Sequence, residues 1–421
     1  MNKTEAAQLL KTNITKTMGC TDIGVVGYIA SIGAYTLRNK QIKSVKLLMS
    51  EELYKNSVNV GIPGLRESGL EKALALGILL KDPKKQLSVF ESVTNDDIEK
   101  IGAILDNIDV EIKYKHFDDT VLYEELNLIS TEGDEVTIVI KDSYDNVIKV
   151  VRNGNTLEEY ETEQLLERVT KFKIKTFDEI YDFIEKEDYE GLDYLFETAE
   201  IQYENARKEI IKEGGKYLSE DLRPAQKDCV YDLSNFLRMH IYVPSRMRMA
   251  GEIYTVYGVA GSGNLGIGTL ITPMFLADTL KLSELERKKI ILLSFLTSVY
   301  VKQEMNIVTV LCGTGHATGC SAAVVTAYIK GGTRKQVKDS INIYLSSSMG
   351  FVCDGAKLSC THKVSFAAMN GMIAGKMAVE DEEYCDGTGL NKISVDQTIR
   401  NLGKLNNEIL NSANKGIIDL I

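Results

Sequence analysis

The sequence has little of what marks several common classes of protein. Acidic residues outnumber basic ones by 60 to 49, and the formal net charge is −11. Because phosphate binding needs a clustered cationic surface, this balance speaks against a nucleic-acid partner. The chain has only 5 prolines and no low-complexity tract, whereas 44% of its residues are hydrophobic. A sizeable core is therefore expected, and extensive disorder is not.

Long apolar runs and paired cysteines are also missing. No stretch approaches the roughly 20 apolar residues that a membrane-spanning helix needs. The N-terminal residues contain no cationic head followed by an apolar run, so no signal peptide is visible. The 7 cysteines are an odd number, and the lack of a CxxC pair disfavours zinc-ribbon and thioredoxin sites. We therefore expect reduced thiols in a cytoplasmic protein that makes no membrane contact.

The residue patterns divide the 421 residues into segments of different texture. We predict an N-terminal helical segment (1–85) that packs on the catalytic domain, a small α/β subdomain (86–170), a charged helical connector (171–218) and a helical, cysteine-bearing catalytic domain (219–421). The predicted fold class is therefore α+β, a mainly helical catalytic domain with an inserted small α/β sandwich subdomain.

Short β-type runs separated by turn formers support the subdomain. We predict strands at 87–90, 110–114, 126–129, 136–140 and 147–151, and an earlier run at 45–50 is also compatible with a strand. A helix is predicted over 95–108, with Thr94 as its N-cap.

Three cysteines lie beside glycine or polar residues rather than inside an apolar stripe. These are Cys312, Cys353 and Cys360. On a helix, the seven-residue spacing of the last two would separate their sulfurs by about 10.5 Å, which is too far for one metal atom. The spacing suits a turn at Gly355 or a polynuclear ligand. Three scattered thiolates suit an iron–sulfur cluster in which one iron lacks a protein ligand and acts as a Lewis acid.

The other cysteines have simpler interpretations. Core packing is the usual role of a free cysteine, and we expect it for Cys229 and Cys385. Cys320 lies in a small-residue stretch that indicates tight helix packing. Cys20 stands at or just before the start of the first long helix of the N-terminal segment.

A glycine-rich loop offers a second kind of site. Residues Gly261–Gly266 match GxGxxG and follow a β-compatible run at 253–259, which is typical of a dinucleotide site. Such a site also needs a βαβ unit and an acidic residue about 20 positions on, but residues 280–289 have a helical pattern. The alternative is that backbone N–H groups and the Asn264 side chain hold a small anion such as a carboxylate.

Taken together, five motifs resemble one family. The chain resembles the L-cysteine desulfidase group of UPF0597-type proteins, related to the α-chain domain of iron–sulfur L-serine dehydratases. The motifs are Gly19-Cys20-Thr21-Asp22, Arg248-Met249-Ala250-Gly251, Gly261-Ser262-Gly263-Asn264-Leu265-Gly266-Ile267, Tyr300-Val301-Lys302 leading to Leu311-Cys312, and Cys353-Asp354-Gly355-Ala356-Lys357-Leu358-Ser359-Cys360.

The resemblance implies an oxygen-sensitive [4Fe–4S] lyase. It would convert L-cysteine or L-serine to pyruvate and ammonia, with release of sulfide or water. Cys312, Cys353 and Cys360 would hold the cluster, and Cys20, with a pKa lowered by its place at a helix start, would accept a proton. The substrate carboxylate would lie against Arg248 and the loop residues Gly261, Ser262, Gly263 and Asn264. The resemblance also suggests a homodimer.

Some positions depart from the family pattern. Asp22-Ile23 replaces the usual Glu-Pro, and Pro63–Gly69 replaces a Pro-Gly-Thr-Gly loop with bulkier, charged residues. This second change leaves open whether cysteine or serine is the substrate. His316 and His362 lie beside two of the cysteines, where a structural role and a role beside substrate or cluster both remain open.

Two other functions stay open at this stage. A nicotinamide-dependent oxidoreductase would use the glycine loop, and a sensing protein would hold the cluster and an amino acid without turnover. A pyridoxal phosphate enzyme would need a Schiff-base lysine, and Lys357 alone does not indicate one.

Overall fold

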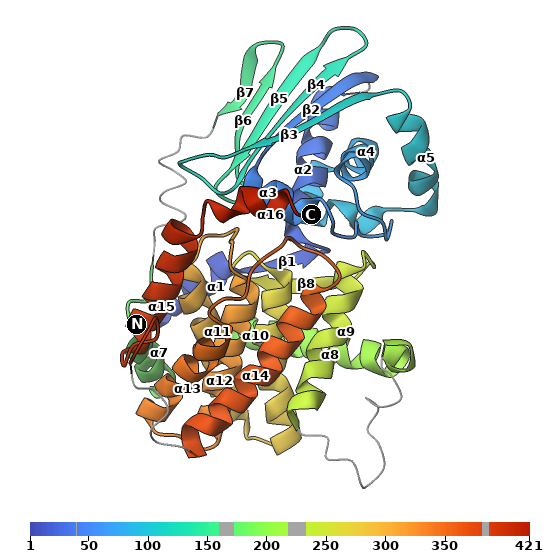
Figure 1. The fold of residues 1–421 in the computed structure, drawn as a ribbon. Helices are drawn as coiled ribbons and strands as arrows, with labels where there is room; N and C mark the ends of the chain where they lie inside the picture. The colour runs from blue at the N-terminus through green and yellow to red at the C-terminus, as the bar shows by residue number, and fades with distance from the viewer. Residues whose placement is uncertain (39, 160–171, 218–232, 381–386) are drawn as a thin grey trace.

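The computed structural model describes residues 1–38, 40–159, 172–217, 233–380 and 387–421. A mixed sheet with its covering helices stands above a larger assembly of helices (Figure 1). The predicted α+β class, mainly helical with a small sheet-containing part, is confirmed. Among the described helices, none is both long and apolar enough to cross a bilayer.

Six strands form the mixed sheet, in the order β3-β2-β4-β5-β6-β7. They are β2 (Ile42–Ser50), β3 (Asp109–Lys115), β4 (Tyr123–Ser130), β5 (Glu135–Lys141), β6 (Val147–Arg152) and β7 (Asn155–Glu159). β2 and β3 are parallel, and the other neighbours are antiparallel. The strands predicted from 110 onward are confirmed, and the run at 45–50 belongs to β2, so the sheet draws on both the first and the second predicted segment.

Three helices accompany this sheet: α2 (Thr21–Thr36), α4 (Leu70–Leu80) and α5 (Asn95–Leu105). β4 alternates between buried and partly exposed residues, as expected for a strand with one covered face. α2 packs on that face, where an added Cβ at Gly33 would lie 2.4 Å from Leu128. The predicted capping of α5 by Thr94 is confirmed, although the helix ends at Leu105.

The predicted strand at 87–90 is wrong. These residues belong to a 3₁₀ segment, η1 (Pro83–Ser92). The side chain of Phe90 packs against α2 at Gly27, where an added Cβ would lie 2.2 Å from the ring. A short apolar run cannot by itself distinguish a strand from another buried segment, and here its partner is a helix surface rather than a strand edge.

The larger part is built from long helices. They are α1 (Lys3–Asn13), α7 (Phe177–Ile184), α8 (Asp193–Tyr217), α9 (Leu233–Met249), α10 (Gly263–Leu280), α11 (Glu284–Gln303), α12 (Gly313–Ile329), α13 (Arg334–Ser348), α14 (Cys360–Glu380) and α15 (Val395–Lys404). α10 and most of α12 are buried on every side, as expected for helices at the centre of a core. A two-stranded antiparallel sheet of β1 (Ile14–Met18) and β8 (Thr255–Val259) accompanies them.

Short elements lie where the two parts meet. α3 (Glu51–Ser57) follows directly on β2, and α16 (Ala413–Ile418) packs against it after a π-helical turn, η3 (Leu405–Ile409). Figure 1 shows α3, α16 and the C-terminus between the sheet and the long helices. The junction is therefore closed by elements from opposite ends of the chain.

Candidate active site

A small cavity lies at this junction, with a volume of about 90 Å³. Four helices begin at its wall: α2, α10, α12 and α14. Because the N-terminus of a helix carries unpaired N–H groups and a partial positive charge, four such ends around one cavity favour anionic groups inside it.

Cys20 is the N-cap residue of α2 and is 5% exposed. Its Sγ donates a hydrogen bond to Asp22 Oδ2 at 3.0 Å. Burial raises the pKa of the Cys20 thiol well above its usual range and Asp22 raises it further, whereas Arg248 acts in the opposite direction. The lowered pKa expected from the helix start is therefore wrong, because burial outweighs the helix dipole.

Asp22 is held by donors from the sheet and from the junction. Tyr144, in the turn between β5 and β6, donates its hydroxyl to Asp22 Oδ1 at 2.8 Å, and Asn56 Nδ2 of α3 lies 3.5 Å from the same oxygen. Tyr144 and Asn56 both line the cavity, and neither was predicted. A tyrosine in a polar turn carries no local signal of a site 122 residues away along the chain.

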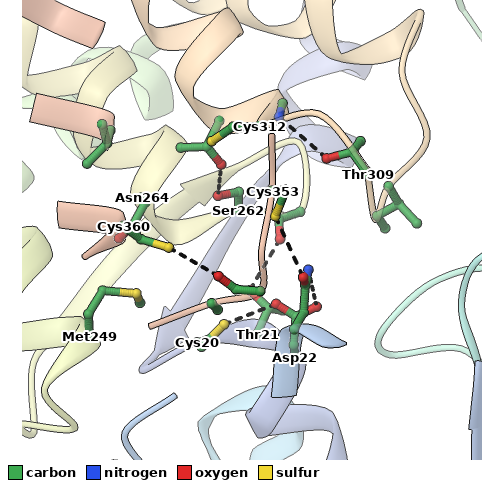
Figure 2. Close-up of a pocket in the computed structure, with 18 of the residues that line it drawn as sticks. Cys20, Thr21, Asp22, Met249, Ser262, Asn264, Thr309, Cys312, Cys353 and Cys360 are labelled. Carbon is green, nitrogen blue, oxygen red and sulfur yellow. Dashed lines mark hydrogen bonds between the residues drawn. The ribbon is translucent and has the colours of Figure 1, made fainter. Parts of the chain in front are cut away.

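Cys312, Cys353 and Cys360 all line the same cavity (Figure 2). Cys312 is the N-cap of α12, and its Sγ accepts a hydrogen bond from Gly315 N at 3.4 Å. Cys360 is the first residue of α14. The chain between Cys353 and Cys360 turns at Gly355, with φ of +90°, so the seven-residue spacing does not hold the two sulfurs apart along a helix.

Burial and the closeness of the thiols to one another disfavour their charged forms. Burial raises the pKa of Cys312 to about 12, and Cys353 and Cys360 raise it further. Burial and Cys353 likewise raise the pKa of Cys360 to about 11. A bound metal centre reverses this effect because it stabilises thiolates. Among the described residues, no group of three or more Cys, His, Asp or Glu side chains is placed to hold a single metal ion.

Arg248 and Asn264 form another part of the cavity wall. Arg248 ends α9, is 2% exposed, and donates from Nη1 to Asn264 Oδ1 at 3.1 Å. Its Nε is buried and has no hydrogen-bond partner among the described residues. Because leaving a buried donor unpaired is costly, this guanidinium is suited to a small anionic ligand.

The glycine loop packs around this arginine. Gly261 has φ of +79°, which favours glycine, and an added Cβ at Gly263 would lie 2.4 Å from Arg248 Nε. At Gly266 an added Cβ would lie 1.8 Å from the Tyr257 carbonyl oxygen. Since β8 pairs antiparallel with β1, the strand before the loop is not the parallel strand of a βαβ unit. The GxGxxG spacing thus reflects close packing and does not support the nicotinamide alternative.

The predicted loop residues lie at or beside the cavity. Gly261, Ser262 and Asn264 line it, and Gly263 lies directly behind Arg248. Ser262 is the N-cap of α10, and its Oγ lies 2.9 Å from the Thr314 hydroxyl of α12. This contact joins the starts of two of the helices that face the cavity.

Lys302 is a lining residue to which no role was assigned from the sequence. It is 7% exposed near the end of α11, and its Nζ donates to the Asn306 carbonyl oxygen at 2.9 Å. Burial lowers its pKa to about 8, whereas Cys312, Cys353 and Asp22 act in the opposite direction. The cavity therefore holds two buried cationic side chains.

The histidines beside the cysteines take structural positions. His316 is fully buried, with its two ring nitrogens 2.8 Å from the carbonyl oxygens of Cys312 and Ser348. His362 is exposed and contacts the rings of Tyr242 and Phe366. Neither histidine is among the lining residues of the cavity.

The remaining sequence features lie away from the cavity. Cys320 is fully buried within α12, and Lys357 forms an ion pair with Asp354. Cys229 and Cys385 fall outside the described residues. The altered loop 63–69 contributes no residue to the described cavity wall; it packs behind Cys20, where an added Cβ at Gly19 would lie 2.2 Å from the Pro63 ring.

Comparison with known proteins gives consistent results. The family model for the serine dehydratase alpha chain matches residues 84–419. A UPF0597 protein of Thermosipho africanus is 30% identical over 411 residues, covering 96% of each chain. A UPF0597 protein of Fervidobacterium nodosum is 29% identical over 409 residues, covering 97% of this chain and 94% of its own.

Proposed function

The chain belongs to the serine dehydratase alpha chain family and to the UPF0597 family, and on this premise we propose that it is an iron–sulfur-dependent amino-acid lyase. The observation that carries the proposal is that three thiols, from two segments of the chain, line one small cavity together with a buried arginine whose Nε has no hydrogen-bond partner among the described residues.

Cys312, Cys353 and Cys360 would hold a [4Fe–4S] cluster. When bound, the cluster supplies an iron without a protein ligand, which acts as a Lewis acid on the β-substituent of the substrate.

The substrate carboxylate would bind between Arg248 and the start of α10. Arg248 lines the cavity, and the side chain of Asn264 fixes the Nη1 side of its guanidinium. Gly261 and Ser262 line the cavity directly before the start of α10, where a helix N-terminus favours an anion. This binding orients the Cα–H bond of the substrate.

Cys20 Sγ would accept the Cα proton. This step needs the Cys20 thiolate, and Arg248 is the buried cation whose charge favours that form. Loss of the Cα proton and of the β-substituent gives an enamine, which hydrolyses to pyruvate and ammonia. The β-substituent leaves as sulfide from L-cysteine or as water from L-serine.

Anaerobic purification and cluster reconstitution test the proposal. Iron and acid-labile sulfide are counted, and pyruvate release is measured with L-cysteine and L-serine, with the D-enantiomers as controls. We expect about four irons per chain and pyruvate from one of the L-amino acids only. The substrate that reacts identifies the leaving group.

The other outcomes contradict the proposal in different ways. Iron without pyruvate from either amino acid would favour a cluster-holding sensor, and binding of the amino acid without turnover would establish it. Failure to take up iron after reconstitution would rule out the cluster and with it the lyase.

A further inference from the structure

The backbone that leads into Cys312 is held by asparagine side chains from the C-terminal segment. Asn406 Oδ1 accepts a hydrogen bond from Leu311 N at 2.9 Å. Asn407 Oδ1 accepts from Asn306 N at 3.1 Å, and Asn407 Nδ2 donates to the Glu304 carbonyl oxygen at 2.9 Å. The π-helical turn η3 thus presents two successive asparagines to one loop.

These contacts complete a small ladder between two of the cysteine-bearing segments. Cys312 N donates to the Phe351 carbonyl oxygen at 2.6 Å, and Cys353 N donates to the Val310 carbonyl oxygen at 2.7 Å. In such an antiparallel pairing the N–H of the residue between points to the other side. Asn406 meets that N–H, the one of Leu311, as a third strand would.

A third asparagine acts through a buried lysine. Lys55 is fully buried, and its Nζ donates to Asn414 Oδ1 at 2.8 Å and to the Thr309 carbonyl oxygen at 3.0 Å. Asn414 Nδ2 in turn donates to Glu52 Oε1 at 3.1 Å. Thr309 lies close to Cys312 (Figure 2), so α16 and α3 together hold the loop that leads into Cys312.

The same lysine supports the second cysteine-bearing segment. An added Cβ at Gly355 would lie 2.2 Å from the Lys55 carbonyl oxygen, so the turn after Cys353 packs directly on the backbone of α3. Movement of Lys55 would therefore reach both the Cys312 and the Cys353 segments.

We propose that Asn406, Asn407 and Asn414 form an asparagine clamp that positions Cys312 and Cys353 for ligation. The clamp residues are positioning residues, since their contacts are with the backbone before Cys312 and with Lys55. The inference rests on the proposed function for its purpose, but the clamp itself is defined by contacts within the chain.

Alkylation of the cluster-free chain tests the clamp without reference to activity. The full-length protein is treated with iodoacetamide, and labelling of each cysteine is followed by peptide mass spectrometry. For Asn406→Ala we expect Cys312 to be labelled about fivefold faster than in the wild type, because the loop opens more often when a backbone bond is lost. Cys320, buried in α12, is the internal reference for an intact core.

Asn401→Ala is the matched control. Asn401 lies in α15 and donates to the Leu390 carbonyl oxygen at 2.8 Å, away from the cysteine-bearing loops. We expect wild-type labelling of Cys312 in this variant. Equal labelling of Cys312 in the wild type, Asn406→Ala and Asn414→Ala would overturn the clamp.

A milder variant covers the case in which Asn406→Ala opens the whole fold. If Cys320 is also labelled faster in Asn406→Ala, the clamp is tested with Asn407→Ala instead, because Asn407 is only half-buried. Faster labelling of Cys312 alone would support the clamp, and joint labelling of both cysteines would refute it. Iron content after reconstitution separates the two proposals: an iron-free wild type with a clamp-dependent Cys312 rejects the lyase and leaves the clamp standing.

Discussion

At the scale of single residues, the four cysteines at the cavity differ in what their sulfur atoms contact. Cys20 donates to a carboxylate, whereas Cys312 accepts from a backbone N–H. Cys353 and Cys360 lie within 4 Å of an amide oxygen and a backbone carbonyl oxygen, respectively. Cys312 is therefore the one of the four whose sulfur accepts a hydrogen bond from the described residues, and the division of roles among them is a matter for substitution.

Single substitutions separate these roles. We expect Cys20→Ala to keep its iron and to lose at least about a hundredfold in turnover, the usual contribution of a general base. Cys312→Ala, Cys353→Ala and Cys360→Ala should each lose iron and turnover together. Iron content and pyruvate release, both measured anaerobically, give the comparison.

Cys320→Ala is the matched control for a buried thiol that does not line the cavity. Its removal should cost about 1 kcal/mol of unfolding free energy, as for other small core deletions, and should leave the iron content unchanged. Complete loss of iron from Cys20→Ala, as in the other three variants, would mean that Cys20 is a ligand and not the proton acceptor.

At the scale of elements, the turn from β8 into α10 explains why its glycines are where they are. An added Cβ meets a flexible side chain at Gly263 but a backbone carbonyl at Gly266. A side chain can move aside, whereas backbone cannot move without disturbing the β1–β8 pair. An added side chain should therefore be tolerated better at Gly263 than at Gly266.

A pair of glycine-to-alanine substitutions measures the effect of the backbone contact at Gly266. Gly266→Ala should lower the unfolding free energy by roughly 2 kcal/mol or more, since overpacking against backbone cannot relax. Gly102→Ala, in the exposed middle of α5 where nothing lies within 4 Å of an added Cβ, should raise it by about 0.5–1 kcal/mol. Urea unfolding monitored by circular dichroism provides the values, and similar effects at both positions would contradict this account of the loop.

Much of the element structure could be predicted from local pattern. The capping sequence at Thr94 and the β-type run at 126–129 are local properties, and both predictions hold. The run at 87–90 was mistaken because its burial comes from contact with α2, which no local pattern reveals. A turn at Gly355 was one of two ways in which the spacing of Cys353 and Cys360 could suit a shared ligand. The segment does turn there, because glycine permits the positive φ that it adopts.

At the scale of the whole molecule, the cavity combines residues from both parts of the fold. Tyr144 reaches it from the sheet, Lys302 from the long helices, and Asn56 from the junction. Nothing near any of the three in the sequence indicates a site, because their shared location depends on how the two parts pack. The cysteines and Arg248 could be selected earlier only because their residue types and motifs point to chemistry.

The sheet also contains a buried acid that links folding to pH. Glu124 in β4 is fully buried between Met49 of β2 and Ile140 of β5, and neither carboxyl oxygen has a hydrogen-bond partner among the described residues. Burial raises the pKa of Glu124 well above its usual range. The folded protein therefore keeps a proton that the unfolded chain releases above its ordinary pKa of about 4.3.

The sign of the pH dependence follows from this proton. Because the folded state binds more protons, the free energy of unfolding falls as pH rises, by up to about 1.4 kcal/mol per pH unit between the unfolded and folded pKa values. Glu124→Gln removes this loss of stability at high pH. The variant should therefore be more stable than the wild type at pH 8, by at least about 1 kcal/mol, and the difference should shrink toward pH 4.

Urea unfolding between pH 4 and pH 8 measures the difference in unfolding free energy. Glu125→Gln is the control, because Glu125 is the next residue along β4 and is only partly buried. A difference between Glu124→Gln and the wild type that stays constant with pH would show that Glu124 does not hold the extra proton.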